Sequence, residues 1–476
     1  MKQTERRARA MVSLDALEAE SRNLDTDGAT LSVWLGELDR FSATYLAANE
    51  TGPAFLPLGP PREDEAVPLH PAPLSQVLKE FDEMALTRGI VPTSGRFFGY
   101  VPGGAVPSAA VGDYVAALTN RYAGVYAASP GAAEIENSAI RWLAEMIGYE
   151  ETAWGTLQSG GSLASLVAII AARETRAPAD WSRGVIYLTE ECHLAIRKAV
   201  HMAGLGQTQL RIVPVDARLR LSADDLARLV AEDRSKGLAP WIVVASAGTV
   251  NTGAVDPLQD IAEIAAREGL WYHVDAAYGG FFILTQRART KLAGLARADS
   301  VVLDPHKGLF LPYGCGAILA RDGDRLRRAF EFTSSYLKDV HHEAPSPTDY
   351  SPELTRHFRA LRLWMSLKLH GLERFRAALE EKLVLAEIAQ ERLVSMPGLE
   401  VGPEPDLSIV AFRVQGDGDS ATQAVLDRIL ARGRVHLSST RLWGKLYIRI
   451  CVLCFRSHRS DLEAALGEIE GALAGR

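Results

Sequence analysis

The sequence predicts an α/β protein built around a largely parallel sheet that is buried on both faces. In the middle of the chain, short apolar segments typical of strands alternate with helical segments. The apolar segments are GVIYLT, LRIVPV, WIVVASA, WYHVD, SVVLD and CGAILA, and the helical ones include LSADDLARLVAED and DPLQDIAEIAAREG. Strands that alternate with helices form βαβ units, in which helices cover both faces of the sheet. A chain of 476 residues is also long enough for two or more domains.

The composition is that of an ordinary globular protein. Hydrophobic residues make up 47% of the chain and charged residues 23%, and the formal net charge is -7. No basic stripe points to nucleic acid or to an anionic membrane. The charged N-terminus lacks the apolar core of a secretory signal, and no apolar run approaches the ~20 residues of a membrane span. We therefore expect a cytoplasmic protein that binds neither nucleic acid nor membrane.

The two ends of the chain differ from its alternating middle. Helical patterns run from about Leu14 to Asn49, and the proline-rich TGPAFLPLGPPREDEAVPLHPAPL follows as an extended strap. Near the other end, a long helical segment that starts in ELTRHF, with a kink expected near Gly371, leads into a small unit of strands and helices. We expect an N-terminal helical segment with its strap over residues 1–95. A large domain over 96–375 and a small α/β domain over 376–476 follow.

Cysteine and histidine clusters do not indicate a metal or disulfide site. The chain has four cysteines, too few for a disulfide framework. Cys451 and Cys454 form a C-x-x-C pair within LYIRICVLCF, which has the pattern of a strand, and residues three apart on a strand face opposite sides. His341, His342 and Glu343 resemble a metal-binding fragment, but adjacent histidines point apart, so we interpret them as a solvated loop. We expect no metal and reduced cysteines.

Polar residues suited to chemistry follow several of the predicted strands. Lys307 comes at the end of VVLDPHK, and Asp275 closes WYHVD about one helix and one strand earlier. Both residues can therefore face the same edge of the sheet, where ligands of such sheets bind. His193 and Thr249 follow two other strands. The turn QSGGSLAS opens a helix, and the free amides and dipole of a helix N-terminus favour a phosphate.

Each of these residues also has an ordinary explanation when taken alone. Lys307 can extend its ammonium to water, Asp275 can cap a helix, and His193 can be a simple loop histidine. Their occurrence together, in order at successive strand ends, favours pyridoxal phosphate. This cofactor needs an amine for a Schiff base, a carboxylate at its pyridine nitrogen and an anion-binding helix end. A flat group such as His193 can lie against its ring. A nicotinamide cofactor fits less well, because no strand leads into G-x-G-x-x-G.

Six motifs carry a resemblance to a known family: RFFGYVP, AASPGAAEIE, SGGSLASLVAIIAARE, HVDAAYGG, DPHK and TDYSPELTRHFRALRLW. From Arg96 to Arg459 the sequence resembles the group II pyridoxal-phosphate-dependent decarboxylases, which include aromatic-L-amino-acid decarboxylase and glutamate decarboxylase. The resemblance implies a fold-type I, aspartate-aminotransferase-like architecture. This has a large, mostly parallel seven-stranded sheet domain, a small C-terminal α/β domain and a helical N-terminal segment. It also implies a homodimer with shared active sites, in which NRYAGVYAASPG and the strap lie at the interface.

The resemblance further implies roles for individual residues. Lys307 binds the cofactor, and Asp275 pairs with its pyridine nitrogen. His193 and Ala277 lie on the two faces of its ring, and Thr249 lies near the ring. The phosphate is bound by Gly161, Ser162 and His306. Tyr350, in the polar, proline-rich KDVHHEAPSPTDYSP, matches the tyrosine of a mobile catalytic loop. There it can protonate the carbanion that remains after carbon dioxide leaves. The substrate pocket is matched by Tyr100, Pro102, Tyr122 and Thr355.

The substrate pocket matches the family less well than the cofactor site does. Val101 and Gly103 occupy places where the aromatic enzymes typically carry phenylalanine and threonine, and Thr355 replaces a glycine or serine. We expect decarboxylation of an L-amino acid to its amine and carbon dioxide, with an aromatic substrate such as tyrosine, phenylalanine, tryptophan or DOPA first. The alternatives are an acidic or non-standard amino acid, an oxygen-dependent reaction that gives an aldehyde, and a catalytically silent binding subunit. The presence of His193 and Tyr350 together favours plain decarboxylation.

Overall fold

A computed structural model describes residues 2–60, 66–331, 344–416 and 418–475. The chain divides into two compact units, one formed by residues 1–52 and 56–89 and the other by residues 53–55 and 90–476. The first unit is helical, with α1 (Lys2–Ser21), α2 (Gly28–Thr51), α3 (Leu74–Phe81) and a π-helical turn over Asp82–Leu86. Asp27 fixes the start of α2, because its carboxylate accepts a hydrogen bond from the Thr30 amide at 2.7 Å. The short strands β1 (Phe55–Leu56) and β2 (Gly89–Ile90) fall where the chain passes between the units.

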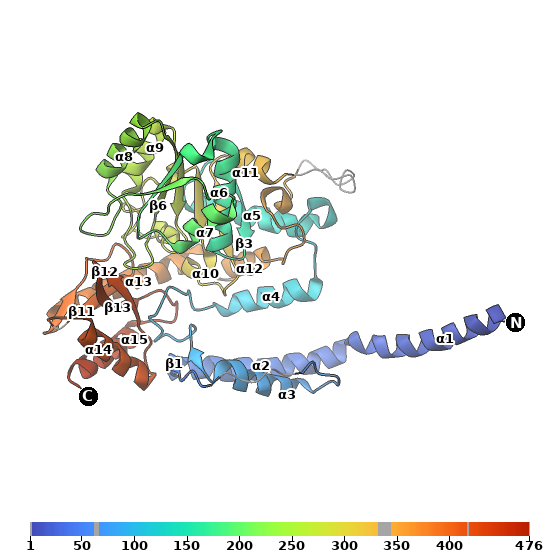
Figure 1. Ribbon diagram of the computed structural model, residues 1–476. Helices are drawn as coiled ribbons and strands as arrows, with labels where there is room; N and C mark the ends of the chain where they lie inside the picture. Colours follow the sequence, from blue (N-terminus) through green and yellow to red (C-terminus); the bar gives the residue numbers. More distant parts are fainter. Residues whose placement is uncertain (1, 61–65, 332–343, 417, 476) are drawn as a thin grey trace. The chain divides into compact units, whose positions relative to one another are not determined.

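The second unit contains a seven-stranded sheet, which confirms the predicted α/β class (Figure 1). Its strands are β3 (Trp154–Gln158), β4 (Gly184–Leu188), β5 (Gln209–Ile212), β6 (Ala239–Ser246), β7 (Trp271–Asp275), β8 (Ser300–Leu303) and β9 (Gly316–Ala320). Their order is β3-β9-β8-β7-β6-β4-β5. Strand β9 runs antiparallel to β3 and β8, and the other pairs are parallel, so the sheet is mostly parallel.

Strand β3 is the one that the apolar pattern does not reveal. Its sequence, WGTLQ, contains a glycine and ends in a glutamine, so it lacks the apolar, β-branched run of a buried strand. All five residues are nevertheless buried. The reason is that β3 pairs with β9 along its whole length and is covered by helices, which the local sequence does not encode.

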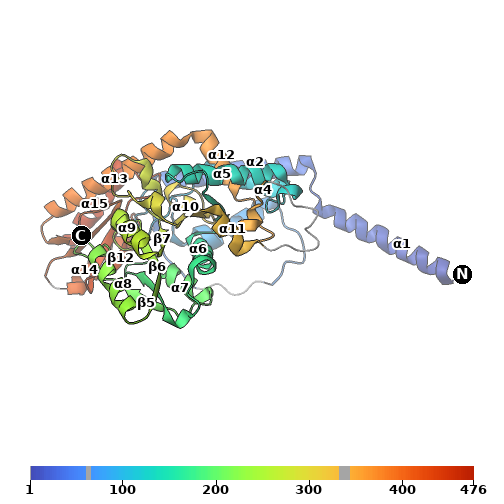
Figure 2. The ribbon, with the colours of Figure 1, turned by 90° about the horizontal axis from the view of Figure 1, so that it is seen from above.

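Both faces of the sheet are buried, as expected for βαβ units. Along β4, Val185 and Tyr187 enter one hydrophobic cluster, while Ile186 and Leu188 enter another. Alternate residues of a strand face opposite sides, so the two clusters lie on opposite faces of the sheet. Helices on each side complete these clusters (Figure 2).

Several of the helices around this sheet begin or end at residues that favour helix boundaries. They are α4 (Pro107–Thr119), α5 (Pro130–Met146), α6 (Gly161–Arg176), α7 (Leu194–Met202), α8 (Ala223–Ser235), α9 (Leu258–Glu268), α10 (Pro305–Gly308), α11 (Gly323–Phe330), α12 (Ala360–His370) and α13 (Leu372–Ser395). Helices α4 and α5 start with Pro107 and Pro130, where a missing N–H costs nothing. Helix α9 ends at Gly269, which adopts a left-handed conformation with φ of 66°.

The C-terminal part forms a second, antiparallel sheet of order β10-β11-β13-β12. Its elements are β10 (Leu399–Val401), β11 (Ile409–Val414), α14 (Gly418–Arg432), β12 (Ser438–Leu442), β13 (Lys445–Cys451) and α15 (Arg459–Leu473). The predicted long helix is two helices, α12 and α13, separated at Gly371, and α12 begins only at Ala360, later than the pattern suggests. The positive φ of Gly371, 70°, ends α12 and redirects the chain.

The cysteines agree with the prediction in part. All four are buried and free. Cys451 is the last residue of β13, so Cys454 lies beyond the strand rather than on it, which corrects the expected geometry. His341, His342 and Glu343 fall outside the described residues. Within the described ranges, no group of three or more His, Cys, Asp or Glu side chains is placed to hold a metal, and no helix is long and apolar enough to cross a membrane.

Candidate active site

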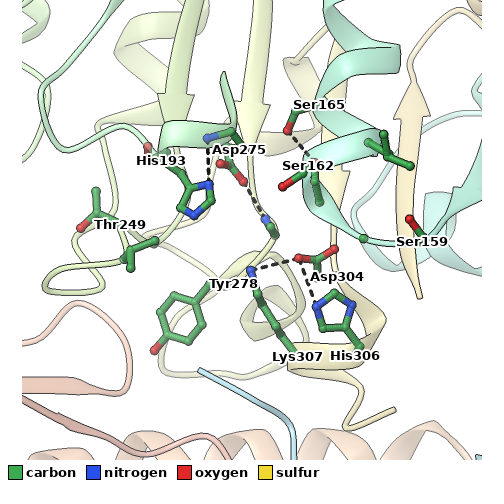
Figure 3. A pocket seen from close by; sticks show the side chains of 18 residues that line it. Ser159, Ser162, Ser165, His193, Thr249, Asp275, Tyr278, Asp304, His306 and Lys307 are labelled. Carbon is green, nitrogen blue, oxygen red and sulfur yellow. Dashed lines mark hydrogen bonds and ion pairs between the residues drawn. The ribbon is translucent and has the colours of Figure 1, made fainter. Parts of the chain in front are cut away.

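A cavity of about 320 Å³ lies at the carboxyl ends of the central strands (Figure 3). All eight residues predicted to bind the cofactor line it: Gly161, Ser162, His193, Thr249, Asp275, Ala277, His306 and Lys307. They come from five separate segments that follow β3, β4, β6, β7 and β8. The parallel topology therefore brings together residues that are far apart in the sequence.

Lys307 lies in the cavity and does not extend its ammonium into bulk water. It belongs to α10, the single helical turn that follows β8. Its Nζ atom forms an ion pair with Oδ2 of Asp304 at 3.0 Å, and the Lys307 side chain is only 21% exposed. Gly103 lies against the outside of this turn, because a Cβ there would meet the Lys307 carbonyl oxygen at 2.5 Å. The amine is therefore held at a fixed place in the cavity wall.

Asp304 is a cavity residue that the sequence analysis missed. Its side chain is 2% exposed, and its Oδ1 atom is buried without a hydrogen-bond partner among the described residues. The signal was available, since Asp304 opens the DPHK motif itself and is a charged residue at the end of a buried strand. Other lining residues that were missed include Ser159, Ser246 and Tyr278.

The turn from β3 into α6 forms an anion-binding corner of the cavity. Gly160 precedes the first residue of α6 as its N-cap, and among the described residues no side chain caps this helix end. Close packing requires glycines here: a Cβ on Gly161 would meet Oδ2 of Asp304 at 2.9 Å, and one on Gly316 would meet the Gly160 backbone at 2.6 Å. An uncapped helix N-terminus beside Ser162 offers backbone amides and a hydroxyl to a phosphate group.

His193 and Asp275 lie on the side of the cavity away from α10 (Figure 3). His193 caps α7: its Nδ1 atom accepts a hydrogen bond from the Ala195 amide at 3.2 Å, which leaves the ring proton on Nε2. Asp275 ends β7, and its Oδ1 atom accepts from the Ala277 amide at 3.1 Å. Its remaining acceptor sites can pair with a protonated ring nitrogen, and the His193 ring can lie against a flat ligand.

Two contacts hold the imidazole ring of His306, which belongs to the α10 turn. Its Nδ1 atom lies 2.7 Å from the Cys315 carbonyl oxygen, which requires the proton on Nδ1, and its Nε2 atom lies 3.6 Å from Oδ2 of Asp304. Burial is the main cause that lowers the pKa of His306 below its usual range. A neutral imidazole in this place can accept a hydrogen bond near the anion-binding corner.

Tyr350 does not line this cavity. It ends a short 3-10 helix (Pro347–Tyr350), is buried, and has its ring 6.0 Å from the ring of Trp154. Burial raises its pKa to about 12. It lines a separate cavity of about 680 Å³ together with Arg141 and Pro345. The sequence correctly places Tyr350 between two helical segments, but the fold packs it against β3.

The four predicted substrate residues also lie outside this cavity. Tyr100 is exposed, with its ring 6.3 Å from that of His436, and Pro102 is buried nearby in the segment that packs on α10. Tyr122 donates a hydrogen bond to the Leu354 carbonyl at 3.3 Å, and Thr355 follows as an exposed residue. The structure thus groups Tyr122 with Thr355 and leaves Tyr100 with Pro102.

A partly buried amine, a strand-end carboxylate and a glycine-rich helix start around one cavity of a mostly parallel sheet define a class of protein. They are the parts that an α/β enzyme needs to hold pyridoxal phosphate. The glycine corner fits that cofactor, and so does Asp275, whose Oδ1 accepts from the Ala277 amide and whose other oxygen can pair with a ring nitrogen.

The chain matches the pyridoxal-dependent decarboxylase conserved domain over residues 59–415. It therefore belongs to the pyridoxal-dependent decarboxylase family, and it is a pyridoxal-phosphate-dependent carboxy-lyase that acts on an amino acid. The predictions of family, cofactor and enzyme class are confirmed, and the interpretation as a silent binding subunit is set aside.

Individual relatives agree with this membership. The chain is 35% identical to an aromatic-L-amino-acid decarboxylase from Bacillus atrophaeus, over 77% of this chain and 78% of that protein. It is 30% identical to an L-2,4-diaminobutyrate decarboxylase from Acinetobacter baumannii, over 70% of this chain and 71% of that protein. The crystal structure of Oryza sativa TDC with PLP and tryptamine superposes with a TM-score of 0.88 at 25% identity and covers 94% of this chain and 98% of that one.

Proposed function

We propose that this enzyme decarboxylates an aromatic L-amino acid to its amine and carbon dioxide, with the cofactor held in the cavity around Lys307. The observation that carries the proposal is the position of Lys307 Nζ inside that cavity, on an ion pair with Asp304. The 35% identity to an aromatic-L-amino-acid decarboxylase supports the aromatic substrate.

In this proposal each cavity residue has one task. Lys307 supplies the amine that attaches the cofactor, and Gly161 and Ser162 hold its phosphate at the start of α6. Asp275 keeps the ring nitrogen protonated, while His193 and Ala277 hold the ring from its two faces. When bound, pyridoxal phosphate accepts the electron pair that the departing carbon dioxide leaves on the α-carbon. The protein residues fix the orientation of the bond that breaks and later return a proton.

We also propose a homodimer whose active sites are shared between subunits. The support is that Tyr100, Pro102, Tyr122 and Thr355 do not line the cavity of their own subunit. Large apolar side chains such as Val33, Val77 and Phe81 are also exposed within the N-terminal helical unit. The proposed domain limits, 1–95, 96–375 and 376–476, and the proposed cytoplasmic location stay predictions.

A second candidate substrate is a non-aromatic amino acid such as a diamino acid. It is favoured by the 30% identity to an L-2,4-diaminobutyrate decarboxylase and by Val101 and Gly103, which depart from the aromatic pattern. The test is a panel of L-amino acids, including diamino and acidic ones, with carbon dioxide, amine and aldehyde measured together. Highest kcat/KM with an aromatic acid and release of amine support the proposal. A preference for diaminobutyrate, or aldehyde as the main product, would overturn it.

A further inference from the structure

Asn251 lies in the turn that follows β6, directly after residues that form part of the cavity wall. The preceding residues of this turn, Thr249 and Val250, line the cavity. The Asn251 side chain makes two short hydrogen bonds to distant parts of the chain. Its Nδ2 atom donates to Oε2 of Glu191 at 2.8 Å, and its Oδ1 atom accepts from the Thr440 hydroxyl at 2.6 Å. A carboxylate at one end and a hydroxyl at the other fix the orientation of the amide.

These two bonds connect three elements around the cavity. Glu191 lies two residues before His193, in the segment between β4 and α7, and Thr440 lies on β12 of the C-terminal sheet. The same sheet holds the turn at a second point: Arg449 of β13, which is buried, donates to the Val250 carbonyl at 2.5 Å. The His193 segment and the Thr249 turn are therefore both tied, through Asn251, to the C-terminal sheet.

The Glu191 carboxylate depends on its Asn251 partner. Burial, the largest effect, raises the pKa of Glu191, and the hydrogen bond from Asn251 acts in the opposite direction. A partly buried carboxylate that loses its donor is costly, so it moves toward water. Because His193 is only two residues away, such a movement shifts the ring that faces the cavity.

We propose that Asn251 is a positioning residue for the cofactor, and that it acts by holding the His193 segment and the Thr249 turn in register with the C-terminal sheet. The inference rests on the proposed assignment of this cavity to pyridoxal phosphate. It adds a contribution of the C-terminal sheet to cofactor binding, through a residue that does not itself need to touch the cofactor.

An exchange of donor and acceptor tests the proposal. Asn251→Asp places two carboxylates against each other, and we expect the dissociation constant of pyridoxal phosphate to rise about ten-fold or more. Glu191→Gln keeps an acceptor for Asn251 and should have little effect. The double variant restores a donor at position 191 and an acceptor at position 251 with unchanged net charge. Its dissociation constant should return to within about three-fold of wild type.

The readouts are the dissociation constant from visible absorbance titration of the cofactor-free protein, the visible circular dichroism of the bound cofactor, and the melting temperature without cofactor. Gln415→Glu is the matched control, because it makes the same change of charge at an amide that follows β11 and donates to the Leu399 carbonyl of β10 at 2.9 Å. It should leave cofactor binding unchanged.

Recovery in the double variant supports the proposal. Three results would overturn it. The first is unchanged cofactor binding and dichroism in Asn251→Asp, and the second is a lower melting temperature of Asn251→Asp with no change in cofactor binding. The third is a double variant that binds the cofactor no more tightly than Asn251→Asp. Borohydride reduction of the wild-type protein, followed by peptide mapping, tests the cofactor site independently of the role of Asn251. Cofactor attached at a lysine other than Lys307 would refute the site assignment itself.

Discussion

Nζ of Lys307 lies 3.0 Å from Oδ2 of Asp304, a carboxylate that is almost completely buried. Within the described part of the chain, the second oxygen of Asp304 has no hydrogen-bond partner, and Nε2 of His306 lies 3.6 Å from the first. The ion pair with Lys307 therefore provides most of the compensation for this buried charge. A substitution of Lys307 should affect the stability of the fold as well as the chemistry.

Lys307→Ala should remove the visible absorption of the bound cofactor and nearly all activity, because it deletes the attaching amine. It should also lower the free energy of unfolding of the cofactor-free protein by about 3 kcal/mol, because Asp304 stays buried without its cation. Adding Asp304→Asn should recover most of that stability and none of the activity. Lys368→Ala, at an exposed position on α12, is the control. Full absorbance and turnover in Lys307→Ala would show that another residue holds the cofactor.

Asp275→Asn keeps the size of the side chain and removes the charge that faces the proposed ring nitrogen. We expect kcat to fall by roughly 10²-fold or more, because an unprotonated ring is a poor electron acceptor. The hydrogen bond from the Ala277 amide can persist, so the fold should not change. Steady-state kinetics at saturating cofactor, together with far-ultraviolet circular dichroism, checks both expectations. A kcat close to that of wild type would remove Asp275 from this role.

Mixing inactive variants tests the shared active sites. Lys307→Ala lacks the cofactor amine, whereas Tyr122→Ala alters a predicted substrate residue that lies outside the cavity of its own subunit. If Tyr122 serves the partner's site, a heterodimer has one intact site. Random reassociation of the two variants then restores about a quarter of the wild-type sites. Activity is measured after mild unfolding and refolding of the mixture, and sedimentation reports the dimer. A mixture as inactive as its components, or an active monomer, would refute shared sites.

Tyr350→Phe tests the tyrosine that the sequence assigns to proton delivery. Because Tyr350 packs against Trp154 away from the cavity, we expect the variant to keep the wild-type ratio of amine to aldehyde, in air and under nitrogen. Another tyrosine, Tyr336, comes two residues before this polar segment in the sequence and falls outside the described residues. If Tyr336 supplies the proton, Tyr336→Phe should release more aldehyde in air. A rise in aldehyde with Tyr350→Phe instead would support the assignment made from the sequence.

His273 should make the protein sensitive to acid. It is fully buried on β7, its Nδ1 atom lies 2.9 Å from the Ser300 hydroxyl, and burial lowers its pKa from 6.5 to about 4. Below pH 6.5 the unfolded chain takes up a proton that the folded protein does not, so the free energy of unfolding falls as the pH is lowered. The loss from this residue reaches roughly 3 kcal/mol near pH 4.

His273→Gln removes this titration while it retains a polar group beside Ser300. The plot of unfolding free energy against pH, from denaturant melts between pH 7 and pH 4, should therefore be flatter for the variant than for wild type. We expect the variant to be less stable than wild type at pH 7, because glutamine packs less well than the imidazole. The comparison therefore uses only the slope of unfolding free energy against pH. Equal slopes would mean that His273 contributes nothing to the acid sensitivity.

The sequence by itself determined the class of the fold and the cofactor side of the site. Lys307, His193 and Thr249 each follow a predicted strand, Asp275 ends one, and the carboxyl ends of parallel strands meet at one edge of a sheet. The alternation of strands and helices, together with this topological rule, was enough to place these four residues together. The cavity confirms that they converge. The missed strand β3 shows the limit, because its burial comes from pairing with β9 and not from its own residues.

Only the tertiary structure decided which individual side chains pair with one another. The ion pair of Asp304 with Lys307, the packing of Tyr350 on Trp154, and the link from Glu191 through Asn251 to Thr440 depend on side-chain directions. The last of these also joins segments about sixty and almost two hundred residues apart. The position of a residue at a strand end fixes which edge of the sheet it reaches. A hydrogen bond requires a placement within tenths of an ångström, which only the packed chain supplies.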